Sequence, residues 1–157
     1  MSRRDQIKMT DDEVAAFLAA EKVVVVATNG RDGFPHQMPL WYVVRGGDLL
    51  AWTYAKSQKI KNLERDPRAT LTIEKGTEYQ ELHGVMLKCD VTLLTVTEQV
   101  AEVGLEIFSK YSGGAAGELD DEVRDMVLKQ ATKRVALRFT ERERATWDHR
   151  KLATGVY

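Results

Sequence analysis

Six segments of the chain have the apolar pattern of β-strands, and four space their apolar residues as a helix does. The strand-like segments cover residues 22–28, 35–44, 49–54, 69–74, 79–96 and 134–140. The helix-like segments cover residues 11–20, 57–65, 98–111 and 119–132. Because strands and helices do not alternate regularly, the pattern predicts a mostly β fold, a largely antiparallel barrel with peripheral helices.

Local signals mark where several of these elements begin and end. Thr10 and Glu13 fit a capping box at the start of the first helix. The four valines at positions 23–26 predict a strand buried on both faces, because β-branched residues favour such strands. The glycine-rich segment 112–117 predicts a break after the third helix, and residues 147–151 are expected to form a C-terminal tail.

The segment 79–96 is much longer than an average strand of about 5–6 residues, as is typical of a strand that serves both ends of a barrel. With no internal repeat or linker, the 157 residues are expected to form one domain, 1–157. Side chains fill so small a barrel. A sizeable ligand is therefore expected outside it or between subunits.

The overall charge limits the classes of partner. With 23 basic and 24 acidic residues the formal net charge is −1, so nothing favours nucleic acid or an anionic membrane. No apolar run approaches the roughly 18 residues of a membrane span. The single cysteine cannot form an internal disulfide, and the start Met1–Arg4 has no apolar stretch of a secretion signal. The expected location is the cytoplasm.

A strand that runs into a helix near residue 57 is the strongest candidate for a binding site. Ser57 is a good N-cap residue, and Lys56 and Lys59 stand where the helix dipole adds partial positive charge. Such a helix start suits an anion. The alternative interpretation is a capped surface helix with solvated lysines.

Several chemistries lack the residues that they need. Three histidines and one cysteine, without metal-ligand spacing, predict no metal site. His83 and Cys89 share one face of a strand, but six residues at roughly 3.3 Å each separate them by about 20 Å, too far for a catalytic pair. Neither a dinucleotide-binding glycine motif nor a nucleophile elbow is present. If the protein is an enzyme, an organic cofactor must carry the chemistry.

Four stretches, taken in order, resemble a known superfamily. They are Val23–Thr28, Gly33–Tyr42, Trp52–Leu63 and Arg65–Ala69, and they include a Lys-x-x-Asn-Leu helix followed by Asp-Pro-Arg and a strand. This arrangement is similar to the split β-barrel flavin and deazaflavin oxidoreductases, which include pyridoxamine 5′-phosphate oxidase. The resemblance implies a six-stranded antiparallel split β-barrel and a homodimer with two cofactors in grooves between the protomers.

The resemblance also implies which residues bind the cofactor. The ring system would be bordered by Gln37, Met38, Pro39, Leu40, Trp52, Thr53 and Tyr54. The phosphate or polar tail would be held by Lys56, Ser57, Lys59 and Asn62. Residues of the partner chain would close the groove, and possible groove-lining residues are His83, Trp147 and Arg150. For Trp41 and Trp52, packing in the barrel core is an equal alternative.

The run Asn62–Arg68 and the C-terminal segment 147–152 look closest to the branch that uses coenzyme F-420, a deazaflavin with a polyanionic tail. This implies hydride transfer from the reduced cofactor to a conjugated small-molecule acceptor. Weak candidates for the proton donor are Tyr54 and His36. His83 and solvent are further candidates. The chain lacks the C-terminal Arg-x-x-x-Trp arrangement of true pyridoxamine 5′-phosphate oxidases, which disfavours that reaction.

Three other functions remain open at this point. The first is an FMN-dependent reductase or oxidase, because a monophosphate also suits Ser57 and Lys59. The second is a non-catalytic flavin- or deazaflavin-binding protein, since a ring site does not require turnover. The third is a structural dimer without a ligand.

Overall fold

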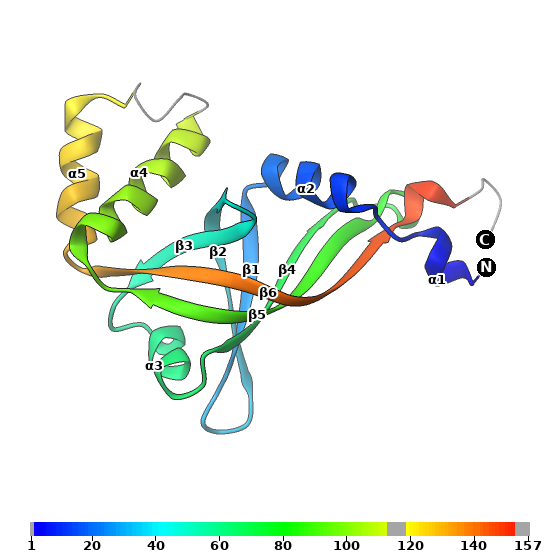
Figure 1. The fold of residues 1–157 in the computed structure, drawn as a ribbon, viewed down its shortest axis with the longest axis horizontal. Coiled ribbons are helices and arrows are strands. Elements are labelled where there is room, and N and C mark those ends of the chain that lie inside the picture. Colours follow the sequence, from blue (N-terminus) through cyan, green and yellow to red (C-terminus); the bar gives the residue numbers. More distant parts are fainter. Residues whose placement is uncertain (1, 113–118, 153–157) are drawn as a thin grey trace.

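The computed structural model describes residues 2–112 and 119–152, and its centre is a closed barrel of six antiparallel strands. The strands are β1 (Val23–Asn29), β2 (Pro35–Arg45), β3 (Asp48–Tyr54), β4 (Arg68–Lys75), β5 (His83–Leu94) and β6 (Arg134–Asp148). Around the barrel they follow the order β1-β2-β3-β6-β5-β4 (Figure 1). The last strand in the sequence therefore lies between β3 and β5. The predicted antiparallel barrel with peripheral helices is confirmed.

Helices cover the ends and one side of the barrel. They are α1 (Arg3–Gln6), α2 (Asp11–Ala20), α3 (Gln58–Arg65), α4 (Thr97–Ser112) and α5 (Asp121–Ala131), with 3-10 turns at Tyr79–Glu81 and His149–Lys151. In Figure 1, α2 lies above the sheet and α3 below it, while α4 and α5 stand together at one end. None of the described helices is long and apolar enough to cross a membrane.

Two apolar clusters hold these elements together. The first fills the barrel and includes side chains from α2 and α3, such as Phe17 and Leu63. The second lies between α4, α5 and the outer face of β2, β3 and β6, where Trp52 packs against α4. At Gly104 the helix approaches so closely that an added Cβ would lie 2.5 Å from the Trp52 ring. A glycine is therefore needed there for the helix to contact the strand.

The start of the fold agrees with the sequence except on one point. Thr10 and Glu13 form the capping box, and α2 has the bounds expected. The prediction that the valine strand is buried on both faces is wrong. Val24 and Val26 point into the barrel, whereas Val23 and Val25 are 45% and 37% exposed. A barrel wall has only one interior face, and no described element covers the outer face of β1 here.

The last two strands differ from their predicted bounds. β5 begins at His83, because residues 79–81 form a 3-10 turn. β6 continues past residue 140 to Asp148, so Trp147 belongs to a strand and the predicted tail is wrong. Residues 141–144 are charged, which hides the strand pattern, and Arg142 forms a bulge opposite Lys88 and Cys89. The predicted glycine-rich break lies largely outside the described residues, which omit 113–118.

Candidate functional site

The start of α3 follows β3 through a tight connection. The N–H of Ser57 donates to the carbonyl oxygen of Tyr54 at 3.0 Å, and Ser57 occupies the N-cap position. Its side chain makes no capping hydrogen bond, so that part of the sequence prediction is wrong. The hydroxyl oxygen is buried and has no partner among the described residues. A buried hydroxyl without a partner is costly, which makes Ser57 Oγ available to a bound group.

Lys59 is the unusual side chain of this helix. It is only 5% exposed, and its Nζ donates to Thr53 Oγ1 at 3.2 Å. It forms no ion pair with any residue in 2–112 or 119–152. Burial lowers the pKa of this amine, because the charged form loses its hydration. A buried ammonium beside a helix start favours an anion as partner. The interpretation of Lys59 as a solvated lysine is therefore wrong.

Asn62 fixes α3 to the barrel. Its side chain is fully buried, and its Nδ2 donates to Thr28 Oγ1 at 3.1 Å. Gln58 Nε2 in turn donates to Asn62 Oδ1 at 2.9 Å. The predicted residues Thr53, Ser57, Lys59 and Asn62 are thus brought together around α3, whereas Lys56 is exposed beside them. Asn62 anchors α3 to β1, while Ser57 and Lys59 provide the polar groups at the start of the helix.

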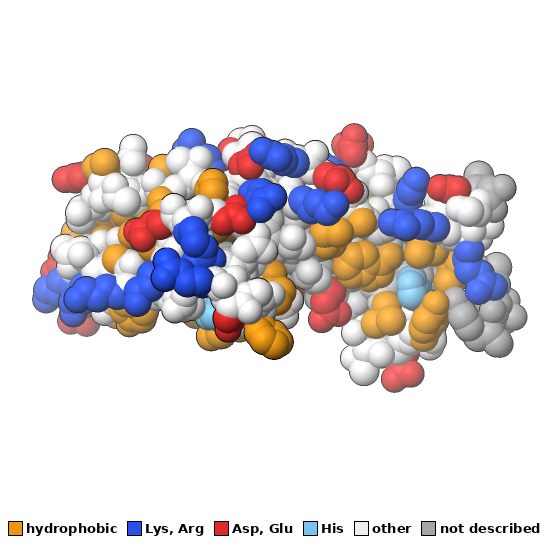
Figure 2. Space-filling model, turned by 90° about the horizontal axis from the view of Figure 1, so that it is seen from below, with side chains coloured by type: hydrophobic (Ala, Val, Ile, Leu, Met, Phe, Trp, Pro, Cys, Tyr) orange, Lys and Arg blue, Asp and Glu red, His pale blue; other side chains and the backbone are white. Residues whose placement is uncertain are grey.

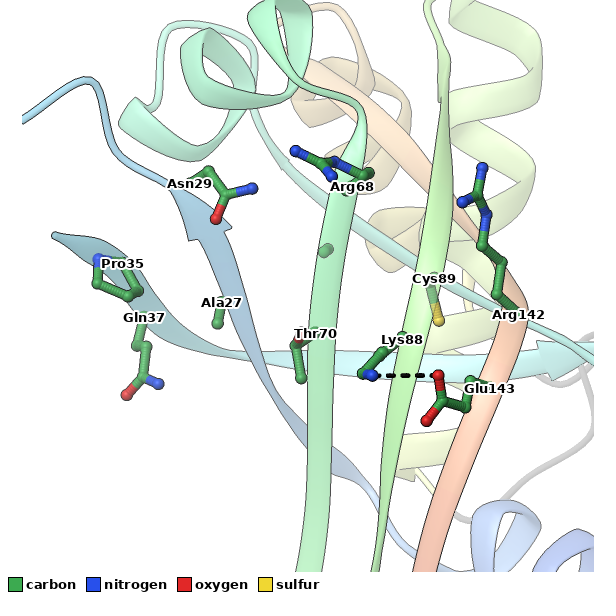
Figure 3. Close-up of a pocket in the computed structure, with 11 residues that line it drawn as sticks. Ala27, Asn29, Pro35, Gln37, Arg68, Thr70, Lys88, Cys89, Arg142 and Glu143 are labelled. Carbon is green, nitrogen blue, oxygen red and sulfur yellow. Dashed lines mark hydrogen bonds and ion pairs between the residues drawn. The ribbon is translucent and has the colours of Figure 1, made fainter. Parts of the chain in front are cut away.

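The predicted ring-bordering residues of β2 do not share one environment. Gln37, Met38 and Pro39 are exposed, whereas Leu40 packs against the barrel core. Gln37 faces a hollow of about 700 Å³ on the outer barrel wall, beside the ion pair between Lys88 and Glu143 (Figure 3). This hollow is separate from the start of α3 and is also lined by Ala27, Asn29, Pro35, Arg68, Thr70 and Arg142.

The two predicted aromatic residues of β3 differ from each other. The indole of Trp52 is buried under α4, so the core interpretation holds for it. Tyr54 is 54% exposed, and the Arg134 guanidinium lies 4.2 Å from its ring centre and 4.6 Å from that of Trp52. Sequence analysis missed Arg134, because only the pairing of β3 with β6 sets it opposite Tyr54. Trp41 is exposed and stacks on Tyr111 at 3.7 Å.

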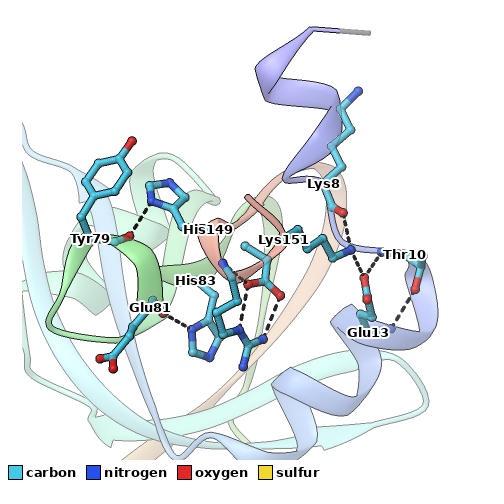
Figure 4. A network of polar contacts seen from close by, with 10 residues as sticks. Lys8, Thr10, Glu13, Tyr79, Glu81, His83, His149 and Lys151 are labelled. Atoms are coloured by element: carbon cyan, nitrogen blue, oxygen red, sulfur yellow. Dashed lines mark hydrogen bonds and ion pairs between the residues drawn. The ribbon is translucent and has the colours of Figure 1, made fainter. Parts of the chain in front are cut away.

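The residues predicted to close the groove from the partner chain lie far from α3 within one protomer. His83 is buried, and its Nδ1 donates to the Glu81 carbonyl oxygen at 2.6 Å (Figure 4). Arg150 binds both carboxylate oxygens of Asp148 at 2.8 Å, which lowers the pKa of that carboxyl group. Trp147 lies over Gly84. Whether these residues reach a neighbouring cofactor groove stays a prediction.

The remaining reactive candidates are inert. Cys89 is buried in the barrel core, and burial raises the pKa of its thiol to about 12, so it is protonated at neutral pH. Cys89 is therefore a small apolar side chain of the barrel core. Within the described ranges, no group of three or more His, Cys, Asp or Glu side chains could hold a metal ion.

Comparison with solved structures gives close agreement in fold. A conserved hypothetical protein of Mycobacterium tuberculosis is 34% identical, with a TM-score of 0.86, over 99% of this chain and 98% of that one. An F-420 reductase is 15% identical, with a TM-score of 0.65, over 86% of this chain and 98% of that one. An FAD-binding protein of Mesorhizobium loti is 18% identical, with a TM-score of 0.64, over 88% and 94%. The last two show a shared fold alone.

Comparison with sequence families identifies the chain. No curated protein matches it. The family model described as pyridoxamine 5′-phosphate oxidase matches residues 10–148, which span all six strands and the helix that carries Lys59. The chain therefore belongs to the pyridoxamine 5′-phosphate oxidase family of split β-barrel proteins.

Proposed function

We propose that the protein is an oxidoreductase that uses coenzyme F-420 and reduces a conjugated small-molecule acceptor. The observations that carry this proposal are the buried amine of Lys59 and the buried, unpartnered hydroxyl of Ser57, two residues apart at the start of α3. When bound, the reduced deazaflavin supplies the hydride. The protein supplies an anion site, a surface for the ring and the exclusion of water.

The residues around α3 fit a cofactor with a negatively charged tail. Lys59 Nζ and Ser57 Oγ are both hydrogen-bond donors, and an anion bound at the start of α3 would provide acceptors for them. Lys56 and Lys61 are exposed on the same segment and are available to further acidic groups. Seen from below, Lys and Arg side chains form a continuous group on the half of the molecule that carries α3 (Figure 2). Similarity in fold to an F-420 reductase supports this choice.

The exposed ring of Tyr54 is the best candidate for contact with a planar acceptor. Arg134 covers its other face and is itself in contact with the buried Trp52, so the tyrosine ring is held in place. Tyr54 also carries a hydroxyl group at the exposed end of β3, which makes it a candidate proton donor to the reduced acceptor. Its carbonyl oxygen accepts from the N–H of Ser57, three residues later, so the acceptor surface lies close in the chain to the anion site.

An FMN-dependent reductase or oxidase is the second candidate. Lys59 is the single lysine among the described residues that is buried, and one buried cation suits one phosphate group. The similarity in fold to an FAD-binding protein agrees with a flavin.

Titration of the purified protein with oxidised F-420 and, separately, with FMN distinguishes the candidates. Binding is monitored by cofactor fluorescence, and we expect F-420 to bind more tightly than FMN. We also expect the reduced complex to transfer hydride to conjugated carbonyl or nitro acceptors. Tighter binding of FMN would favour the second candidate. Tight binding without turnover over a broad acceptor panel would leave a binding protein, and binding of neither cofactor would contradict the proposal.

We further propose that the protein is a homodimer whose two chains share the outer wall of β1 and β2. Val23, Val25, Pro39 and Trp41 share the outer face of these strands and are exposed, and such an apolar surface is typical of an interface. Light scattering is expected to give about twice the chain mass of 17.8 kDa. Val25→Glu should give a monomer, whereas Met126→Glu on α5 should not. A monomeric wild-type protein would contradict the proposal.

A further inference from the structure

Arg134 is the first residue of β6, and its guanidinium lies over two aromatic rings of β3, those of Trp52 and Tyr54. Its Nε is buried without a partner, and the side chain forms no hydrogen bond or ion pair with any residue in 2–112 or 119–152. Contact with the rings holds the guanidinium in place but satisfies none of its N–H groups. The two terminal nitrogens therefore remain donors for a bound group.

The surroundings of Arg134 are rich in positive charge. Two segments meet at this end of the barrel, residues 49–63 and 126–140, where the Ala55 N–H donates to the Lys133 carbonyl oxygen at 3.0 Å (Figure 1). Neither segment contains an aspartate or a glutamate. Their basic residues are Lys56, Lys59, Lys61, Lys129, Lys133, Arg134 and Arg138. A negatively charged ligand is thus favoured at this end before any single contact forms.

The helices packed on this part of β3 do not supply a carboxylate to Arg134. On α4, Glu98 and Glu102 are exposed and form no ion pair with it, and Glu106 is bound to Arg45. The acidic residues of α5 all lie in the first half of that helix, away from the turn into β6. An unpaired, half-buried arginine fits a ligand that brings the missing carboxylate.

We propose that the acceptor of the reaction is an anion, a planar conjugated molecule whose carboxylate binds Arg134 while its ring system contacts Tyr54. This inference rests on the proposed function, because it names the class of acceptor. A guanidinium presents two parallel N–H groups that match the two oxygens of a carboxylate. A carboxylate bound there lies beside the exposed Tyr54 ring, since the guanidinium is 4.2 Å from the centre of that ring.

The same placement distinguishes the two candidate proton donors. Tyr54 pairs with Arg134 across β3 and β6, so an acceptor held by the arginine lies next to the tyrosine. His36 lies opposite Thr28 on the β1–β2 hairpin and lines a separate hollow beside α3. Arg134 therefore acts as a residue that selects and positions the acceptor, and Tyr54 is the proton donor within its reach.

The test compares two probes, 4-nitrobenzoate and 4-nitrobenzamide, which share a ring and a nitro group and differ in charge. Their affinity for the full chain is measured by isothermal titration calorimetry, first without and then with saturating oxidised F-420. Wild type is expected to bind the benzoate about tenfold more tightly than the amide in both states, the effect of one charge-assisted contact. Arg134→Gln should lose this preference and keep its affinity for the amide within about twofold.

Two further variants separate a specific contact from general charge and from packing. Arg138→Gln removes the same charge from the same strand and should keep the preference for the benzoate. Arg134→Lys retains the charge without the paired N–H groups and should keep only part of it. Loss of the preference in Arg138→Gln to the same extent would overturn the inference. Equal affinity of wild type for the two probes would also overturn it, and that comparison holds even if Arg134→Gln does not fold.

The remaining outcomes distinguish this inference from the proposed function. If saturating F-420 displaces the benzoate, an acidic group of the cofactor occupies Arg134, which would overturn the assignment to the acceptor. Reduction of both probes by reduced F-420 with equal KM would keep the proposed function and overturn the inference. A preference for the benzoate that depends on Arg134, in a protein that binds no F-420, would keep the carboxylate site and overturn the proposed function.

Discussion

Replacement of Lys59 by methionine is expected to weaken cofactor binding by about 10- to 100-fold, because a hydrogen bond to a charged group contributes about 1.5–3 kcal/mol. The same change is expected to stabilise the free protein by about 1–2 kcal/mol, because it removes a buried amine that has no carboxylate partner. Methionine retains most of the volume of the side chain. Fluorescence titration and thermal unfolding measure the two effects on the same samples.

The stability gain of Lys59→Met should depend on pH in a defined direction. Burial lowers the pKa of Lys59 below its ordinary value of 10.5, so the unfolded chain binds the proton more tightly than the folded one. Wild-type stability therefore rises with pH between the folded and the unfolded pKa. The advantage of the variant is largest at neutral pH and shrinks toward pH 10.5. Lys129→Met, an exposed lysine on α5, should leave both properties unchanged. Unaltered cofactor affinity in Lys59→Met would contradict the anion site.

Replacement of Gly104 by alanine is expected to destabilise the protein by about 1–3 kcal/mol, the usual cost of overpacking a core. In an exposed helix the same substitution would stabilise by about 1 kcal/mol, so the sign is diagnostic. A Cβ at position 104 would lie 2.5 Å from the Trp52 ring. The ring cannot move away easily, since Phe108 and Arg134 pack against it. Urea unfolding measures the change.

A second substitution tests whether the clash is the cause. The atoms nearest the added Cβ belong to the six-membered ring of the indole, which phenylalanine at position 52 would not extend as far. Trp52→Phe should therefore cost less in the Gly104→Ala background than alone. Gln99→Ala, exposed on the same helix, should change stability by less than about 0.5 kcal/mol. A Gly104→Ala variant more stable than wild type would contradict the packing of α4 on β3.

Features that depend on a few neighbouring residues could be predicted from the sequence. The capping box of Thr10 and Glu13 joins residues three positions apart, so it is visible in the sequence and is confirmed. The strand–helix junction before α3 is equally local. Ser57 occupies the predicted N-cap position, but its side chain makes no cap hydrogen bond, because such a bond depends on the rotamer that packing allows.

Features that depend on the closure of the barrel could not be predicted in the same way. Val23 and Val25 belong to a run of valines that is typical of a buried strand. They are exposed because a barrel has only one interior, which their neighbours Val24 and Val26 occupy. Arg134 comes opposite Tyr54 through pairing between strands 80 residues apart in the sequence. The burial of Lys59 arises from its contact with Thr53, which no helical pattern reveals. The most informative groups of the site are therefore those for which a single sequence has the weakest signal.

The position of β6 between β3 and β5 also decides when the barrel can form during synthesis. Until residue 148 has left the ribosome, β3 and β5 each present an unpaired edge, and β5 lacks the longest pairing of the sheet. The N-terminal strands can associate early, but the interior stays open to water. The barrel therefore cannot close before β6 is available, and until then the nascent chain exposes two strand edges that other chains could pair with. Pairing of β6 with β3 and β5 both closes the barrel and removes the two edges through which incomplete chains could aggregate.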